Sequence, residues 1–567
     1  MEDSCPEDEL LDLAIARQDE GRFAEAFALH KRRMMAEPRL HKTDAVRLLG
    51  WNNSTRQQVP ELEGIFAATR VGQSFRPLLH DVESNNKSMG QSARQVFDHY
   101  GYCLDAGRQI LLTLLGSVED DHQQQRIFSG NSFFNHRHDL PALELHVLHD
   151  NNTDHPKPTM GLNVLLYLFL FGLAVERDLV IQAIGQDECN ALFRAGLLQP
   201  SLALQGDVVA SVQVYPLSTS DLFPSDGTTN NSSSSEKSNN TLLLLPTDWP
   251  LESFHPKRNA IMPIGYDTLE LCALSAGDDN IRTEGPNNIL DLCCGCGVQG
   301  LLWITCHPNS WSQLVLVDIN PRACHYVMAS LALNGLLRME NNNKIHVLQG
   351  NLYDPIRVHL SEDMTFQRIL TNPPFVADFC NTTTDGGALY AGSGICGLDA
   401  VHDIVNRCFQ YLAADDNGQL LMVTELPNVQ QSCQLLESFL APPKEDSRNN
   451  KEHSISIAYV VADVETVQEY AQERAEERGT STNHHQRNQW EADMQQHGIH
   501  NRALVLAAIG QSSSMGQGSI LRLFPYEDQT WSGSDAVLED PADEDDAFLT
   551  LAGVMFARNA LLSGNGA

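Results

Sequence analysis

The chain is poor in positive charge. Its 567 residues carry 38 lysines and arginines against 73 aspartates and glutamates, which gives a formal net charge of −35. Nucleic-acid affinity rests on basic patches that pair with phosphate, so this imbalance argues against loose binding of a nucleic-acid backbone over the surface. A basic patch confined to one part of the chain is still compatible with it.

A long apolar run is also lacking. The most apolar stretch, 161–175, is short and leads straight into Glu176, Arg177 and Asp178. A helix that crosses a membrane needs about 20 apolar residues. The stretch therefore predicts a buried helix, and the sequence predicts no membrane partner.

The cysteines lack the spacing of a disulfide framework. There are 13 of them, and the N-terminus that precedes them is acidic, unlike a signal or transit peptide. We expect reduced thiols in a cytoplasmic protein, with the nucleus as the alternative. The run 293–296 is formally C-x-x-C, but no second pair follows at zinc spacing, so no metal site is predicted.

What the chain does contain is a series of four apolar segments, each followed by a polar or glycine-rich turn. We predict strands at 289–292, 314–317, 345–348 and 368–371, with a helix at 298–306 after the first. The carboxyl ends of parallel strands meet at one edge of a sheet, where such folds bind ligands. The turns should therefore lie together and bind a nucleotide-like molecule.

The turns carry groups that suit such a ligand. Gly295 and Gly297 allow the backbone to approach it closely. Asp318 ends the second strand, where a carboxylate can accept both hydroxyls of a ribose, and Asn351 follows the third. The fourth strand ends in the tetrapeptide Asn372-Pro373-Pro374-Phe375.

This tetrapeptide decides between enzyme classes. The pattern G-x-G-x-x-G at 295–300, with an acidic residue about twenty positions later, also fits a dinucleotide-binding dehydrogenase. In a methyltransferase, however, the side-chain oxygen of Asn372 and the carbonyl of Pro373 can accept hydrogen bonds from a substrate NH2 group. Two prolines stiffen the loop, and Phe375 can stack on a planar group. We therefore favour methyl transfer to a planar nitrogen over a dehydrogenase or an inactive relative.

The four motifs resemble those of class I S-adenosylmethionine-dependent methyltransferases with an N-P-P-[FY] motif. This "small" group includes the release-factor glutamine methyltransferases and the ribosomal-RNA guanine-N2 methyltransferases. The resemblance covers roughly 254–508, including MPIGYDTLEL at 262–271 and YAGSGICGLDAVHDIV at 390–405. It implies a Rossmann-like α/β fold with a seven-stranded sheet, and S-adenosylmethionine as cofactor.

The resemblance also implies the roles of individual residues. The implied cofactor-binding residues are Thr268, Asp291, Cys293, Gly295, Gly297, Asp318, Asn351, Leu352 and Asn372. The implied catalytic residues are Asn372, Pro373, Pro374 and Phe375. Cys293 stands where the family usually has glycine, and Asn351 where it often has aspartate, which puts the affinity for the cofactor in question at both positions.

The substrate is less well determined. The acidity of the chain and the glycine-rich stretch 390–405, which is similar to that of the glutamine enzymes, favour a protein amide or another amide-bearing substrate. An RNA base is the alternative. A non-catalytic cofactor-binding or scaffold subunit is the third hypothesis, and the intact tetrapeptide argues against it.

Three regions are expected along the chain. Residues 1–90 should form a helical N-terminal region, 91–246 a winged-helix-like α+β module, and 254–560 the methyltransferase domain. In the module we predict a long helix at 92–116, the buried helix at 161–175, helices at 178–184 and 188–196, and a hairpin at 202–216. With few lysines or arginines, a structural or substrate-covering role is favoured over nucleic-acid binding.

Two polar insertions should interrupt the methyltransferase domain as surface loops, at 446–454 and 474–501. The remaining strands are expected at 419–425, 456–464 and 503–509.

Overall fold

The computed structural model of this chain falls into two units, residues 1–265 with 325–339, and residues 266–324 with 340–567. It describes residues 89–115, 130–135, 160–201, 206–222, 242–249, 260–276, 287–337, 343–361, 363–377, 392–394, 396–413, 418–440, 454–477, 484–512 and 520–523, besides a few single positions before residue 30. The predicted helical region 1–90 and the predicted loop at 446–454 lie almost wholly outside these residues.

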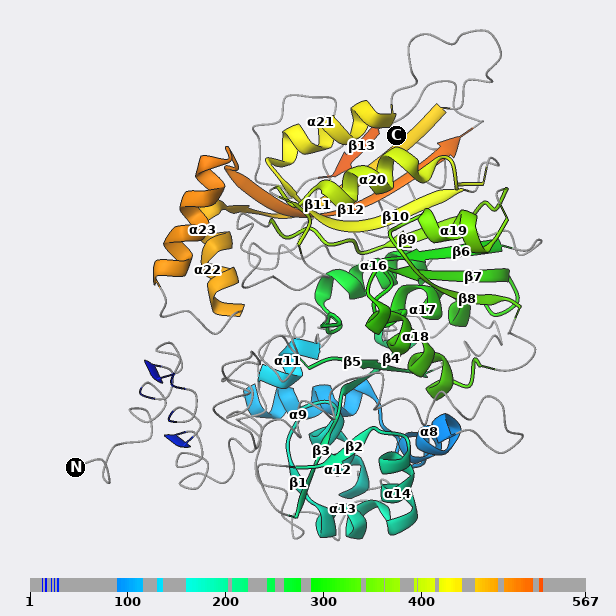
Figure 1. Cartoon of the computed structure of the whole chain (residues 1–567), viewed down its shortest axis with the longest axis vertical. Helices are drawn as coiled ribbons and strands as arrows, with labels where there is room; N and C mark the ends of the chain where they lie inside the picture. The colour runs from blue at the N-terminus through cyan, green and yellow to red at the C-terminus, as the bar shows by residue number, and fades with distance from the viewer. Residues whose placement is uncertain are drawn as a thin grey trace, which may run out of the picture. The chain divides into compact units, whose positions relative to one another are not determined.

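The second unit is built on one eight-stranded sheet (Figure 1). Its strands, in spatial order, are β13 (Ile520–Leu523), β11 (Ser454–Thr466), β12 (Asn501–Ser512), β10 (Gln419–Pro427), β9 (Arg368–Thr371), β6 (Asn287–Leu292), β7 (Trp311–Asp318) and β8 (Ile345–Gln349). β8, β7, β6, β9 and β10 pair in parallel, while β12 pairs antiparallel with both β10 and β11. Leaving out β13, the order in the sequence is 3-2-1-4-5-7-6, with one reversed strand.

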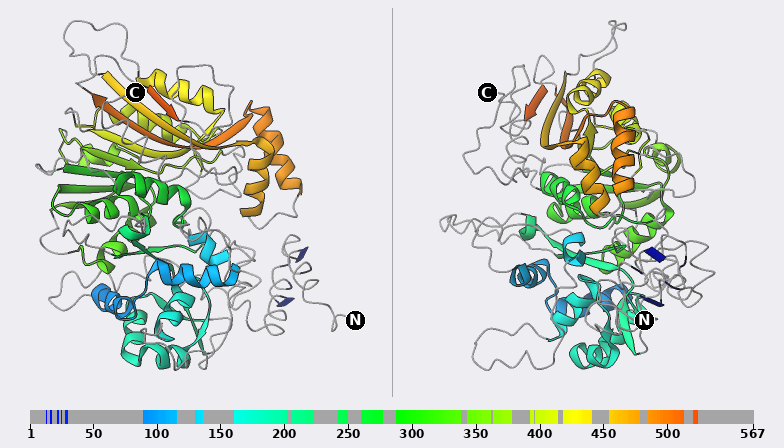
Figure 2. Two further views of the ribbon diagram at one scale, coloured as in Figure 1. Left: turned by 180° about the vertical axis from the view of Figure 1, so that it is seen from behind. Right: turned by 90° about the vertical axis from the view of Figure 1, so that its left-hand side faces the viewer.

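Helices cover both faces of this sheet (Figure 2). They are α16 (Tyr266–Ala276), α17 (Val298–Cys306), α19 (Asp354–His359), α20 (Asp399–Cys408) and α21 (Val429–Leu440). A further helix, α18 (Pro321–Leu333), begins in this unit and lies mostly in the first. On one face, alternate strand residues such as Leu290, Val315 and Ile369 share a core with Ile404 of α20 and Cys433 of α21. On the other face α17 packs against the sheet closely, because a side chain at Gly300 would meet Leu314 and Asp291.

All seven predicted strands of this sheet are present. The strand at 368–371 and the helix at 298–306 have the predicted bounds, and the structure extends the other strands by one to three residues at one end or at both. Buried parallel strands are easy to recognise as short apolar runs between turns. β13 was not predicted.

The predicted surface loop at 474–501 was wrong. The structure has two helices there, α22 (Val467–Glu477) and α23 (His484–Gln496), between β11 and β12. Their buried residues Val467, Tyr470 and Met494 form a small core of their own. A capping box starts α22, since Glu469 N donates to Thr466 Oγ1 (3.2 Å) and Thr466 N donates to Glu469 Oε2 (2.8 Å).

The first unit contains a helix–strand–helix–helix–strand–strand module. In order it comprises α12 (Met160–Phe169), β1 (Val175–Glu176), α13 (Arg177–Ile184), α14 (Gln186–Arg194), β2 (Leu198–Pro200) and β3 (Asp207–Ala210), and the antiparallel strands lie in the order β1-β3-β2. The order of these elements is that of the predicted winged-helix-like module, but two of its predicted elements were wrong. The apolar helix ends at Phe169 and not at 175, because Gly172 has a left-handed φ of 77°. The hairpin predicted at 202–216 is not one unit, since β2 pairs with β3 while 213–218 pairs with 242–247 in another sheet. Every α12 residue from Gly161 to Phe169 except Asn163 is buried, as predicted for the apolar stretch.

The long helix predicted at 92–116 was wrong, because the structure breaks it in two. α8 (Met89–His99) ends before Gly101, which has a left-handed φ of 67°, and α9 (Leu104–Leu115) begins three residues later. Tyr102 N donates back to Phe97 O (3.0 Å), as at a helix that closes on a C-terminal glycine. Apolar residues keep their helical spacing across the break, so periodicity alone does not reveal it.

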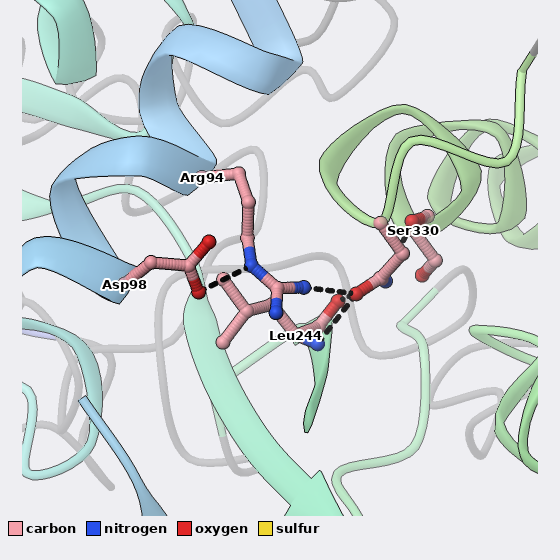
Figure 3. A network of polar contacts seen from close by, with 5 residues as sticks. Arg94, Asp98, Leu244 and Ser330 are labelled. Carbon is pink, nitrogen blue, oxygen red and sulfur yellow. Dashed lines mark hydrogen bonds and ion pairs between the residues drawn. The ribbon is translucent and has the colours of Figure 1, made fainter. Parts of the chain in front are cut away.

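A polar network ties α8 to a second, two-stranded sheet of this unit, formed by β4 (Gln213–Ser218) and β5 (Leu242–Thr247) (Figure 3). Asn334 bonds both backbone groups of Leu244 in β5, each at 2.9 Å. Arg94 Nη1 of α8 donates to Asn334 Oδ1 (2.8 Å), and Arg94 Nε donates to Asp98 (2.7 Å).

In the part of the chain that the structure describes, no helix combines the length and the apolar character that a membrane span requires.

Candidate functional site

The pairing of the parallel strands brings the predicted turns to one edge of the sheet. Leu292, the last residue of β6, pairs with Val317 on one side and Thr371 on the other, and Asp318 pairs with Gln349. The residues that follow these four strands therefore start from the same level. The sequence prediction that the turns lie together is confirmed for the backbone.

Asp318 is bonded directly to the glycine turn. Its Oδ2 accepts from Gly295 N (2.9 Å) and its Oδ1 accepts from Asn320 N (2.8 Å). Burial raises the pKa of Asp318, although these two amides act in the opposite direction. Each carboxylate oxygen keeps a further lone pair, so the side chain can still accept ribose hydroxyls.

Asp291 is fully buried at the end of β6. Its Oδ2 accepts from Gly300 N (2.8 Å), which fastens the start of α17 to the strand, while no described residue bonds Oδ1. Burial, and secondarily the charge of Asp318, raises the pKa of Asp291 well above its usual range. Two acidic groups at this edge of the sheet suit a cationic ligand such as S-adenosylmethionine.

The turn itself is strained at Cys293, whose φ is 56°. The usual family residue at this position is glycine, which adopts such a φ at no cost. Gly295 and Gly297 also have positive φ (54° and 83°), and a side chain at Gly295 would meet nothing within 4 Å. Burial raises the pKa of the Cys293 thiol, as it does for Cys294 and Cys296, so these are unreactive neutral thiols.

In the turn after β8, Asn351 and Leu352 differ in their exposure to solvent. Asn351 is exposed, and its carbonyl accepts from Asp354 N (3.0 Å) at the start of α19. Leu352 has a φ of 46° and its side chain is buried in the main core. Leu352 can therefore frame an adenine only through its backbone.

The tetrapeptide after β9 is held at both ends. At the first end, Asn372 Nδ2 donates to Asp267 Oδ2 (2.9 Å) and to Thr268 Oγ1 (3.1 Å), both at the start of α16. Each hydrogen of this amide thus has an acceptor. Among the described residues, none donates a hydrogen bond to the Asn372 carboxamide oxygen.

At the other end, the Phe375 carbonyl accepts from Arg502 Nη2 (2.7 Å). Arg502 is only 1% exposed, lies 3.3 Å from Glu425 Oε2, and its guanidinium carbon is 4.8 Å from the centre of the Tyr470 ring in α22. A side chain at Gly397 would come within 2.0 Å of Phe375 O, so only glycine fits beside the loop. The acceptors of the tetrapeptide are thereby preorganised.

Sequence reasoning missed three residues of this site: Asp267, Gly397 and Arg502. Asp267 and Gly397 lie inside the stretches 262–271 and 390–405, which resemble the family. Their position in these stretches was the signal that could have identified them. Arg502 gave none, because it is a single cation at the start of a strand far along the chain.

The chain matches one family model, the methyltransferase small domain, over residues 279–442. Among solved structures it is similar to a ribosomal protein L11 methylase from Lactobacillus delbrueckii subsp. bulgaricus, at 17% identity over 31% of this chain and 68% of that one, with a TM-score of 0.21. It is also similar to the METTL16 methyltransferase domain (15% identity, 42% and 64% covered, TM-score 0.22) and to the plantazolicin methyltransferase BpumL in complex with SAH (14%, 43% and 83%, TM-score 0.21). Likenesses this weak carry no argument about substrate.

The family match falls on the strands and turns that form this edge of the sheet. With the strand order described above, it makes the second unit a Rossmann-like class I methyltransferase that uses S-adenosylmethionine.

Proposed function

We propose that the second unit methylates the nitrogen of a planar NH2 group, with a protein amide as the favoured substrate. The observation that carries this is the orientation of Asn372. Both hydrogens of its amide are directed to Asp267 and Thr268, so its oxygen remains to accept a hydrogen bond from a substrate. The Pro373 carbonyl supplies the second acceptor.

These acceptors address the chemical difficulty of the reaction. The lone pair of an amide or aryl amine is delocalised, which makes the nitrogen a poor nucleophile. Acceptors on its two hydrogens turn the NH2 group out of conjugation and stabilise the positive charge that grows as the bond forms. When bound, the cofactor would supply a methyl group activated on its sulfonium sulfur. Transfer to the substrate nitrogen would leave the bonding electron pair on sulfur, and the methylated nitrogen would release a proton to solvent.

The residues at the other turns suit the cofactor. We assign the ribose to Asp318, the amino-acid part to the turn 293–297 with Asp291, and the adenine to the backbone at Asn351 and Leu352. The fit is supported by the buried Asp291 oxygen that no described residue bonds, and by the open space beside Gly295. Thr268 lies at the methyl-transfer end through its contact with Asn372.

Features of the first unit favour a protein over RNA. In a winged-helix module the second helix of the pair, here α14, would enter a nucleic-acid groove. Its first turn carries Asp187 and Glu188, and α14 packs against α8. Like charges near phosphate are unfavourable, so this helix is a poor reader of nucleic acid. An RNA base remains the alternative substrate, and a non-catalytic subunit is disfavoured by the preorganised tetrapeptide.

The test is a methylation assay with tritiated S-adenosylmethionine and an extract of cells that lack this protein. Substitution N372A should lower incorporation by about tenfold to a thousandfold while calorimetry shows near-normal cofactor binding. The control N190A, a polar change in the first unit, should have no effect. A parallel loss of affinity and rate in N372A would contradict the assigned role.

The same labelled extract distinguishes the substrates. Label that disappears with protease but survives ribonuclease supports a protein. The reverse result would make RNA the substrate, and label in neither polymer would indicate a small amide-bearing molecule.

A further inference from the structure

The contact between Asn372 and α16 has a chemical consequence beyond orientation. We propose that Asp267 is a positioning residue that fixes the Asn372 carboxamide and strengthens its oxygen as an acceptor. This inference rests on the proposed N-methyl transfer. It concerns a residue that sequence reasoning left unassigned, 105 positions before its partner.

Asp267 determines the orientation of the Asn372 carboxamide. An asparagine side chain can place either its NH2 group or its oxygen on a given side. With Asp267 Oδ2 2.9 Å from Nδ2, the flipped rotamer would set the carboxamide oxygen against a carboxylate oxygen at that distance. Repulsion between the two acceptors excludes this rotamer. Thr268 Oγ1 at 3.1 Å holds the second hydrogen and completes the restraint.

Asp267 also polarises the Asn372 amide. Hydrogen bonds that share a group reinforce one another, most strongly where water is excluded. Asp267 is 9% exposed and Thr268 5% exposed. A carboxylate that draws on the N–H bonds of Asn372 moves electron density through the amide to its oxygen. That oxygen then accepts more strongly from a substrate nitrogen whose positive charge is growing.

Two substitutions distinguish the effect of the charge of Asp267 from the effect of its shape. In D267N the side chain keeps its size and one acceptor oxygen but loses the charge. We expect D267N to lower the methylation rate about tenfold, and D267A about tenfold to a hundredfold, in line with a hydrogen bond to a charged group. Cofactor affinity should stay within about twofold in both.

A double-mutant cycle identifies the route of the effect. If Asp267 acts through Asn372, adding D267N to N372A should cause no further loss of tritium incorporation from labelled S-adenosylmethionine into the extract. A residue that merely supports the fold would add its own loss in either background. Such additivity, or a fall in cofactor affinity that matches the fall in rate, would overturn the proposal.

A measurement without substrate tests the same contact. In protein labelled with ¹⁵N-asparagine, the Asn372 side-chain amide is identified by its disappearance in N372A. A proton bonded to a carboxylate resonates downfield, so D267N should move one Asn372 amide proton upfield. The matched control is E270Q at about pH 8, which removes a negative charge from the same helix and should leave both protons in place. Unchanged proton shifts in D267N would refute the proposal.

The outcomes keep this inference apart from the proposed function. If N372A retains full incorporation, or the wild-type protein labels nothing, the proposed function fails, and the proton shifts still decide whether Asp267 holds Asn372. If N372A loses incorporation while D267N keeps it, the function stands and the positioning role is wrong.

Discussion

Glu270 gives the sharpest prediction about stability. It lies in α16, and burial alone raises the pKa of its carboxyl from 4.5 to about 7. No described residue bonds its Oε2. Burial removes the Glu270 carboxyl from water and so disfavours its charged form. The folded protein therefore holds the proton more tightly than the unfolded chain does.

The sign of the pH dependence follows. Between pH 4.5 and about 7 the folded state binds more protons at this position than the unfolded state, so the contribution of Glu270 to stability falls as pH rises. A shift of this size corresponds to about 3 kcal/mol once both states are ionised. Glutamine at 270 does not titrate. The free energy of unfolding of E270Q minus that of the wild type should therefore rise by about 3 kcal/mol from pH 4.5 to pH 7.5.

Urea unfolding at a series of pH values measures this difference, followed through the fluorescence of buried tryptophans such as Trp303 in α17, which packs against α16. Any constant cost of the new amide cancels, because only the change with pH is compared. The control is E469Q. Hydrogen bonds from Thr466 lower the pKa of Glu469, so its contribution to stability is lost as pH falls, the opposite direction. Parallel stability curves for E270Q and the wild type would refute the burial argument.

Three further predictions concern the site and its supports. D318A should weaken cofactor binding in calorimetry by at least about tenfold, because it removes both the ribose acceptor and the bond to the glycine turn, and unchanged affinity would refute the ribose assignment. G397A should destabilise the protein by more than about 1 kcal/mol in urea unfolding and slow methylation, whereas G335A, with a similar φ and open space around it, should cost less. T466A should cost about 1 kcal/mol through loss of the capping box, and an unchanged unfolding midpoint would contradict that geometry.

The central sheet could be predicted because its signals are local. Strands such as 289–292 and 368–371 are buried on both faces, so each is a short apolar run that ends at a turn. The helices α22 and α23 were missed because most residues of the predicted loop at 474–501 are polar. One local signal was present, since Thr466 and Glu469 have the spacing of a capping box, and the polarity of the following residues outweighed it.

The contacts that make the tetrapeptide useful could not be predicted in this way. The acceptors that orient Asn372 come from Asp267 and Thr268, and the donor that holds the Phe375 carbonyl comes from Arg502, 127 positions later. Nothing in the spacing of these residues links them, because they meet only once α16 packs against the sheet and β12 pairs with β10 within it. The motif therefore specifies which acceptors the enzyme presents, while residues far along the chain determine how firmly those acceptors are aimed.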